Sequence, residues 1–137
     1  MRLDVVTPKG KLLDAEVDEV TAPGVLGEFG VLPGHIPFLT AIRAGVLSFR
    51  GAQGAGTVAV GPGYAQVSND HVVVLTDVGA LVKDIDAQAA QRELAEAQKQ
   101  LDQVENDPGK HADLESKRNW AQARLDAAGA TGIATTH

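Results

Sequence analysis

Cysteine is absent from this sequence of 137 residues, which excludes a disulfide framework and every cysteine-based zinc site. Aromatic residues make up only 4% of the chain. No run of about 18 apolar residues occurs, so a membrane-spanning helix is not expected. Asp4 and Pro8 interrupt the first apolar stretch, so a secretory signal is not expected either. The core must therefore be held together by packing alone.

Positive charge is also scarce, because 12 Lys and Arg residues face 18 Asp and Glu residues and leave a net charge of -6. A surface of this sign repels phosphates, which argues against nucleic acid and anionic lipid as partners. Hydrophobic residues still make up 44% of the chain, the balance of a folded globular protein. We therefore expect a small folded protein that neither binds nucleic acid nor inserts into a membrane.

Sequence motifs of catalysis are missing as well. The glycines form neither a GxxxxGK(S/T) loop nor a GxGxxG turn between a strand and a helix, and no serine lies in GxSxG. The four histidines, His35, His71, His111 and His137, are too dispersed for a HExxH metal site. No cofactor, metal site or catalytic residue is expected.

The two halves of the chain differ in composition. Residues 1–84 hold twelve of the fifteen glycines and five of the six prolines, which interrupt this half too often for helices of normal length. Short valine-rich stretches lie between these breaks and predict strands at 3–6, 17–21, 46–49, 57–60 and 72–75. We predict a flexible hairpin connection at 51–56 and a tight turn at 68–70. About ten short strands in an antiparallel β-sandwich are expected.

The second half is rich in Ala, Gln, Glu, Leu and Lys, which favour helices. Asp86 is a candidate N-cap, and Ala87, Ala90, Leu94, Ala97, Leu101 and Val104 follow on one stripe. Residues 106–109 read Asn-Asp-Pro-Gly, a strong turn signal. A second helix over about 112–128 then presents Leu114, Ala121, Leu125 and Ala128 on one side. The spacing predicts an antiparallel helical hairpin with a small, alanine-rich contact.

The fold class expected is therefore α+β with two segregated parts. Residues 1–84 are predicted to form the β-sandwich domain, and residues 85–137 the helical hairpin, with a frayed tail at 129–137 that lacks periodicity.

One segment of the first half combines turn signals with candidate contact residues. Residues 22–37 place a lone acid, Glu28, an aromatic, Phe29, and a histidine, His35, among glycines and prolines. The alternative is a plain pair of turns, with Gly27 and Gly30 allowing positive φ. Because a rigid scaffold commonly presents its contact residues on loops, we interpret the segment as a docking edge.

The run from Gly27 to Pro37, read as GEFGVLPGHIP, resembles the GEhGhhPGHxP signature of the epsilon subunit of bacterial F-type ATP synthases, where h is apolar. The similarity covers nearly the whole first half. Residues 3–8 resemble the opening strand of that family, 39–45 the following segment and 60–76 the closing strands. The second half is similar in architecture more than in residue identity.

The resemblance implies a non-catalytic subunit of the central stalk, or rotor, of the proton-translocating enzyme. In that family the β-sandwich clamps the gamma subunit and rests on the polar loops of the c-ring. By position, Glu28 corresponds to the acid that meets the c-ring. Gly27, Phe29, Gly30 and Val31 shape the same edge, and His35 lies near the junction of gamma and c-ring. The location implied is the cytoplasmic face of the bacterial inner membrane, peripherally and through the complex.

The resemblance also implies a regulatory hairpin that either folds onto the sandwich or extends along gamma toward the alpha/beta catalytic head, where it blocks ATP hydrolysis. Lys117, Arg118 and Arg124 are candidates for contacting that head, the alternative being a solvated helix face. Some members bind ATP here through arginines. Two of the expected arginines are replaced in this chain, by Ala89 and Trp120, so we predict no tight ATP binding.

Two other functional classes remain as alternatives. A free-standing adaptor would use the helical hairpin to grip an unrelated helix. A small hydrolase would need Asp or Glu pairs converging in a cleft, and nothing in the spacing suggests them.

Overall fold

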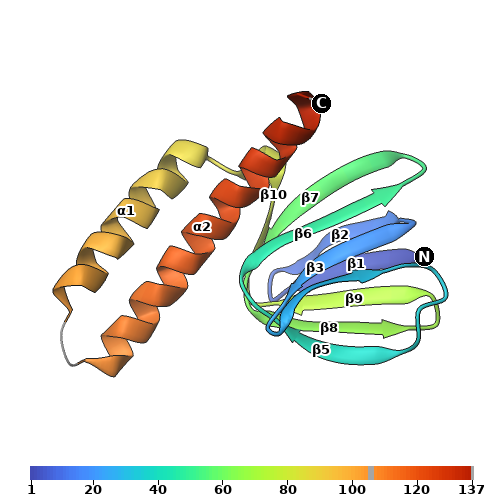
Figure 1. Ribbon diagram of the computed structural model, residues 1–137, viewed down its shortest axis with the longest axis horizontal. Coiled ribbons are helices and arrows are strands. Elements are labelled where there is room, and N and C mark those ends of the chain that lie inside the picture. Colours follow the sequence, from blue (N-terminus) through green and yellow to red (C-terminus); the bar gives the residue numbers. More distant parts are fainter. Residues whose placement is uncertain (105–106, 137) are drawn as a thin grey trace.

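The computed structural model describes residues 1–104 and 107–136, and of residues 130–136 only the backbone. It has a β-rich part followed by two helices, which confirms the predicted α+β class (Figure 1). The ten strands are β1 (Arg2–Thr7), β2 (Gly10–Glu16), β3 (Glu19–Gly24), β4 (Gly27–Val31), β5 (Phe38–Ile42), β6 (Gly45–Gly51), β7 (Gly54–Val60), β8 (Gly63–Ser68), β9 (His71–Thr76) and β10 (Gly79–Leu81). A 3-10 turn, η1 (Val82–Asp84), leads to α1 (Ala87–Gln103) and α2 (Pro108–Thr136).

The strands form one sheet with the order β10-β7-β6-β3-β5-β8-β9-β1-β2, and β4 pairs beside β3. The sheet bends over so that its two halves face each other, and β10 at one end contacts β2 at the other. All strand pairs are antiparallel except β1 and β9, which run parallel from Arg2 opposite His71 to Val6 opposite Leu75. The first and ninth strands therefore lie side by side inside the sheet, between β8 and β2.

The core lies between the two halves of the sheet and is made of branched aliphatic side chains. The largest of these fully buried side chains are Leu3, Val5, Val20, Val31, Ile42, Leu47, Val58, Val60, Val72 and Val74. They alternate with exposed or half-buried residues along most strands, as expected for a sheet with one face in water.

The hairpins explain where the local sequence signals were correct and where they were not. Asn69 and Asp70 both have positive φ and form a two-residue turn between β8 and β9, which confirms the predicted turn. The connection predicted at 51–56 is shorter in the structure, because Gly51 pairs with Gly54 and only Ala52 and Gln53 lie between the strands. Gly56 continues β7, where the Phe49 ring leaves no room for a side chain.

Asp86 caps α1 as predicted, since its Oδ1 accepts a hydrogen bond from the Ala89 N–H at 3.0 Å. Of the predicted stripe, Ala90, Ala97 and Leu101 are buried, Leu94 and Val104 are half-buried and Ala87 is exposed. The turn predicted at 106–109 falls partly outside the described residues, because Asn106 is not described. Asp107 accepts a hydrogen bond from the Lys110 N–H at 3.1 Å and caps α2.

The second helix is longer than predicted. It begins at Pro108 instead of near Ala112, since Pro108 occupies the first helical position after its cap. Residues 129–136, which were expected to fray, are helical, and His137 lies outside the described residues. As Figure 1 shows, α2 lies between α1 and the sandwich and packs against β6 and β7. The Thr57 hydroxyl on β7 donates to the Ala127 carbonyl at 3.4 Å.

Candidate functional site

The predicted docking edge is built on the β3–β4 hairpin. Gly24 pairs with Gly27, so the turn consists of Val25 and Leu26 alone. Gly27 has a φ of 128°, and a Cβ at Gly24 would lie 2.6 Å from the Gly27 carbonyl oxygen. Glycine is therefore required on both sides of the turn. The turn presents Leu26 with 99% of its surface exposed.

Residues of β4 alternate between the two faces of the sheet. Glu28 and Gly30 are exposed, Phe29 is half-buried and Val31 is fully buried in the core. The Glu28 carboxylate makes no hydrogen bond or ion pair with any other residue that the structure describes. Glu28 is thus available to a partner, whereas Val31 supports the edge from inside.

His35 lies on the loop after β4, where Gly34 has a φ of 82°. The His35 N–H donates to the Leu32 carbonyl at 3.1 Å, and the Gly34 N–H donates to Asp70 Oδ1 at 3.3 Å. The His35 ring is exposed, and its centroid lies 5.0 Å from that of the Phe38 ring, with the two planes tilted by 57°. Phe38 in turn meets Phe29 edge to face at 5.5 Å. His35 is therefore connected to β4 only indirectly, through the rings of Phe38 and Phe29. Glu28 and His35 do not contact each other.

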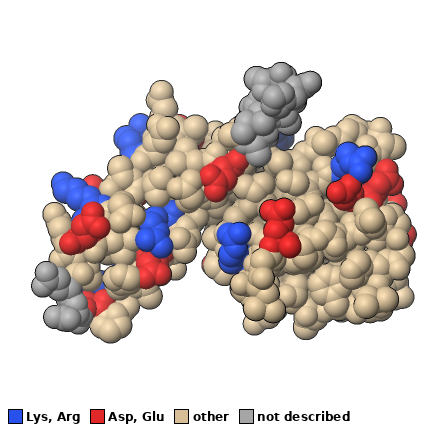
Figure 2. All heavy atoms as spheres, in the orientation of Figure 1, with Lys and Arg blue, Asp and Glu red and all other residues tan. Residues whose placement is uncertain are grey.

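An exposed apolar face on β5, β8 and β9 was missed by sequence reasoning. Leu39, Tyr64 and Leu75 are 67%, 58% and 52% exposed. Tyr64 pairs with both Ala41 and Leu75, so these side chains lie on the same outer face of the sheet. Figure 2 shows no charged side chain on the visible surface over β5 and β8. The available signal was the run from Val72 to Leu75, which is apolar on both faces of its strand.

A charged cluster borders this apolar face on β1 and β2. Asp4 is 6% exposed, and its Oδ2 lies 2.7 Å from Nε2 of His71 on the parallel strand β9. Arg2 and Asp14 form a bidentate pair with a shorter contact of 2.7 Å. The hydrogen bonds from Arg2 lower the pKa of the Asp14 carboxyl, and Asp14 raises the pKa of Arg2. An apolar centre with a polar border is typical of a protein-binding surface.

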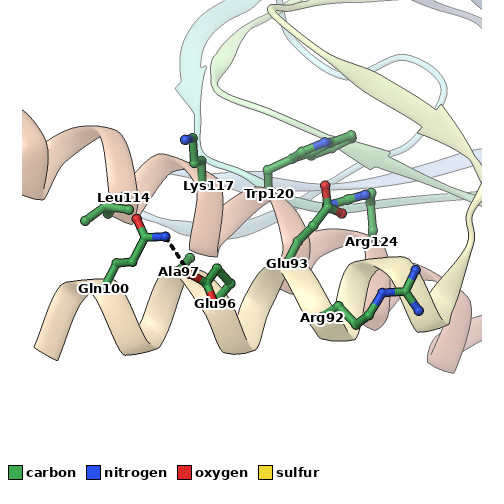
Figure 3. Close-up of a pocket in the computed structure, with 9 residues that line it drawn as sticks. All are labelled: Arg92, Glu93, Glu96, Ala97, Gln100, Leu114, Lys117, Trp120 and Arg124. Carbon is green, nitrogen blue, oxygen red and sulfur yellow. Dashed lines mark hydrogen bonds and ion pairs between the residues drawn. The ribbon is translucent and has the colours of Figure 1, made fainter.

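The three predicted contact residues on α2 have different surroundings. Arg124 is only 16% exposed, and its Nη2 lies 2.6 Å from Glu93 Oε2 on α1. Its guanidinium also covers the Trp120 ring at 5.5 Å (Figure 3). Lys117 is exposed, while half-buried Arg118 contacts Asn119 Oδ1 at 3.4 Å. In this conformation Arg124 links the two helices and is not free for another subunit.

Lys117 and Arg124 line one cavity of about 480 Å³ between α1 and α2, and Arg118 does not. The Ala89 backbone N–H donates to the Asp86 cap, and the Ala89 side chain is only a methyl group. The Trp120 ring is covered by the Arg124 guanidinium. Neither side chain offers the two parallel N–H donors with which arginine forms bidentate hydrogen bonds to a phosphate.

Two further classes of site were tested. Among residues 1–104 and 107–136, no three His, Asp or Glu side chains gather as a metal site. None of the described helices combines the length and the apolar character needed to cross a lipid bilayer.

Comparison with known proteins assigns the chain to a family. Residues 1–81 match the family model for the β-sandwich domain of the ATP synthase delta/epsilon chain. The ATP synthase epsilon chain of Geotalea daltonii is 38% identical over 132 residues, which cover 96% of each chain. That of Geobacter sulfurreducens is 36% identical over 94% of each chain, and that of Citrifermentans bemidjiense is 44% identical over 74% of this chain and 73% of its own.

Solved structures share the fold. A chain of the mitochondrial ATP synthase of Euglena gracilis superimposes with a TM-score of 0.77 at 23% identity, covering 92% of this chain and 79% of its own. One from the central stalk and c-ring structure of Tetrahymena thermophila gives 0.66 at 16% identity, covering 93% and 96%. With matches along nearly the whole length and the signature at 27–37, this chain belongs to the ATP synthase epsilon chain family.

Proposed function

We propose that the chain is a non-catalytic rotor subunit of a bacterial F-type ATP synthase, which couples rotation between the c-ring and the catalytic head. The observation that carries the proposal is the exposed apolar face formed by Leu39, Tyr64 and Leu75. Exposed apolar patches on small folded proteins mark interaction sites. In the proposed complex the gamma subunit covers this face, with the charged residues of β1 and β2 at its border.

The β3–β4 edge is the proposed contact with the c-ring. Glu28 is the exposed acid of β4 and has no partner within the described chain. Its contact with a basic loop would fix the register of the two parts, although an exposed ion pair contributes only about 0 to 1 kcal/mol. Leu26 at the turn and the rigid glycine backbone support this edge. Phe29, Val31 and His35 hold its shape from the core and from the following loop.

The division of labour in this proposal follows the two parts of the chain. Residues 1–84 dock on gamma and the c-ring, and residues 85–137 regulate. The hairpin is held to the sandwich by α2, whose buried residues on that side are alanines, Ala123 and Ala127. Such a contact buries little area and separates at low cost. Once released, the hairpin would reach the alpha/beta head and block hydrolysis, with Lys117, Arg118 and Arg124 as contact residues.

Tight ATP binding to the hairpin is not part of the proposal, because Ala89 and Trp120 occupy two positions where ATP-binding relatives carry arginine. Isothermal calorimetry of the chain with ATP is expected to show no micromolar dissociation constant. Location at the cytoplasmic face of the inner membrane follows from the complex, without direct insertion and without nucleic acid.

Two experiments test the docking proposal. The chain should be recovered with gamma and the c-ring when the complex is purified, and sedimentation of the chain alone in their presence would contradict it. Glu28→Lys should loosen the coupling of ATP hydrolysis to proton pumping while leaving the melting temperature nearly unchanged. A large drop in melting temperature would instead assign Glu28 to the fold.

The regulatory proposal has its own test. ATP hydrolysis by a complex whose chain ends after Asp84 should exceed that of the complete complex. Equal hydrolysis would remove the inhibitory role and leave the coupling role intact.

A further inference from the structure

A second cavity lies between the sandwich and the hairpin, where several turns of the sheet meet the middle of α2. It measures about 420 Å³, within the usual range of small-molecule sites. Its apolar walls come from both parts of the chain, with Ile42, Pro62 and Val78 on the sandwich and Trp120 on α2. A molecule bound here would touch both parts at once.

The wall on the sandwich side is held rigidly by backbone hydrogen bonds. The Gly61 N–H donates to the Val78 carbonyl at 2.8 Å, and the Asp77 N–H donates to the Pro62 carbonyl at 3.1 Å. The buried Thr76 hydroxyl lies 2.9 Å from the carbonyl oxygens of both Gly61 and Val78. The sandwich wall of the cavity is therefore pre-formed, which lowers the entropic cost of binding.

The charges around this cavity select the ligand. Arg43 and Lys117 bring two positive charges and Asp77 one negative, which leaves a single positive charge among the lining residues. Neither Arg43 nor Lys117 forms an ion pair with another residue that the structure describes. The Arg43 side chain donates to the carbonyl of its neighbour Ala44, at 3.2 Å. One net positive charge beside apolar walls fits a monoanion with an apolar body.

The cavity between the two helices is less suited to this ligand. There Arg124 is already paired with Glu93, and Gln100 donates to Glu96 at 2.7 Å. Figure 3 also shows that Trp120 and Lys117 point away from α1. Both residues line the two cavities, but their side chains extend toward the one on the sandwich side.

We propose that the cavity between α2 and the sandwich binds a flat aromatic monoanion, a carboxylate or sulfonate. The ring packs against Trp120 and the apolar wall, and the acid group lies between Arg43 and Lys117. Because the ligand contacts both parts, it binds the docked hairpin and not the released one, and it shifts that equilibrium toward docking. Binding itself is independent of the proposed function, whereas its effect on ATP hydrolysis rests on it.

The test uses the full chain and 8-anilinonaphthalene-1-sulfonate, an aromatic monoanion whose fluorescence reports apolar sites. Trp120 is the only tryptophan of the chain and lines both cavities beside α2, so quenching of its emission places the probe in one of these two cavities. We expect saturable binding of one probe per chain with quenching of Trp120. Arg43→Gln should weaken binding at least about tenfold, because a charge-assisted contact is lost. Absence of saturable binding, or equal affinity in Arg43→Gln, would overturn the proposal.

Matched variants separate the competing sites. Arg92→Gln removes a guanidinium that lines only the cavity between the helices, so it should leave the affinity unchanged. Tyr64→Ser tests the exposed apolar face and should also leave it unchanged. Ala44→Leu keeps every charge but narrows the proposed cavity, and should abolish binding. If Arg92→Gln or Tyr64→Ser weakens binding while Arg43→Gln does not, the proposal is wrong. Circular dichroism confirms that each variant is folded.

Discussion

The sandwich and the hairpin bury different kinds of side chain. The ten largest fully buried side chains that the structure describes are Val, Leu and Ile, and all of them lie between residues 3 and 74. From residue 85 on, the buried hydrophobic residues described are five alanines and two leucines, Ala90, Ala97, Leu101, Leu114, Ala121, Ala123 and Ala127. Each buried CH₂ contributes about 0.8 kcal/mol, so the sandwich has far more to lose by opening. The difference indicates a firmly packed sandwich carrying a hairpin that is held by less buried apolar surface.

The largest effect is expected in the sandwich core. Leu47→Ala removes a fully buried side chain and should lower the free energy of unfolding by about 2 to 5 kcal/mol, measured by denaturant titration. Leu26→Ala is the control, since Leu26 is exposed and its loss should change stability by less than about 0.5 kcal/mol. Equal losses of stability in the two variants would contradict a sandwich that is held together by its buried aliphatic side chains.

A smaller effect is expected where alanines bring the helices together. Ala121 is fully buried, and Ala121→Leu should destabilise the hairpin by about 1 to 3 kcal/mol through overpacking. Trp120 fluorescence should follow the loss, while circular dichroism of the sandwich stays native. Gln122→Leu, one residue further and exposed, is the control. A gain in stability would show that the hairpin is underpacked instead of closely fitted.

The start of the hairpin tests a single hydrogen bond. Asp86→Ala should cost about 1 kcal/mol, because the Ala89 N–H loses its cap. Asp84→Ala is matched to it, since Asp84 is exposed and makes no such bond in the described chain. Thermal unfolding of both variants measures the difference, and equal midpoints would assign no stabilising role to the cap.

The smallest effect concerns pH and the surface of the sandwich. The pKa of Asp14 is lowered by hydrogen bonds from Arg2, so its contribution is present above its unfolded pKa and is lost as pH falls through the folded value. Below about pH 4 the wild type should therefore lose slightly more stability than Asp14→Asn. The pair is exposed, so high salt should remove the difference. Melting temperatures between about pH 2 and 5, at low and high salt, test this, and a salt-independent difference would contradict it.

Local signals were readable from the sequence, and contacts between distant segments were not. Asp86 and the turn at Asn69 and Asp70 were predicted correctly because each depends on its immediate neighbours. The second buried side of α2, with Ala123 and Ala127, was missed because alanines on opposite sides of a helix give no apolar stripe. The edge residues from Gly27 to Val31 were located as a segment, but only the structure separates exposed Glu28 from buried Val31.

The parallel pairing of β1 and β9 also determines when the sheet can be completed during synthesis. Strand β1 gains its second neighbour only with residues 71–76, so its pairing is incomplete until the strands in between have been synthesised. Pairing across such a separation is slow, because the long intervening loop must close first. The hairpin follows the sandwich in the chain, so β6 and β7, against which α2 packs, are synthesised before it. The order of synthesis therefore lets the sandwich fold before the hairpin packs against it.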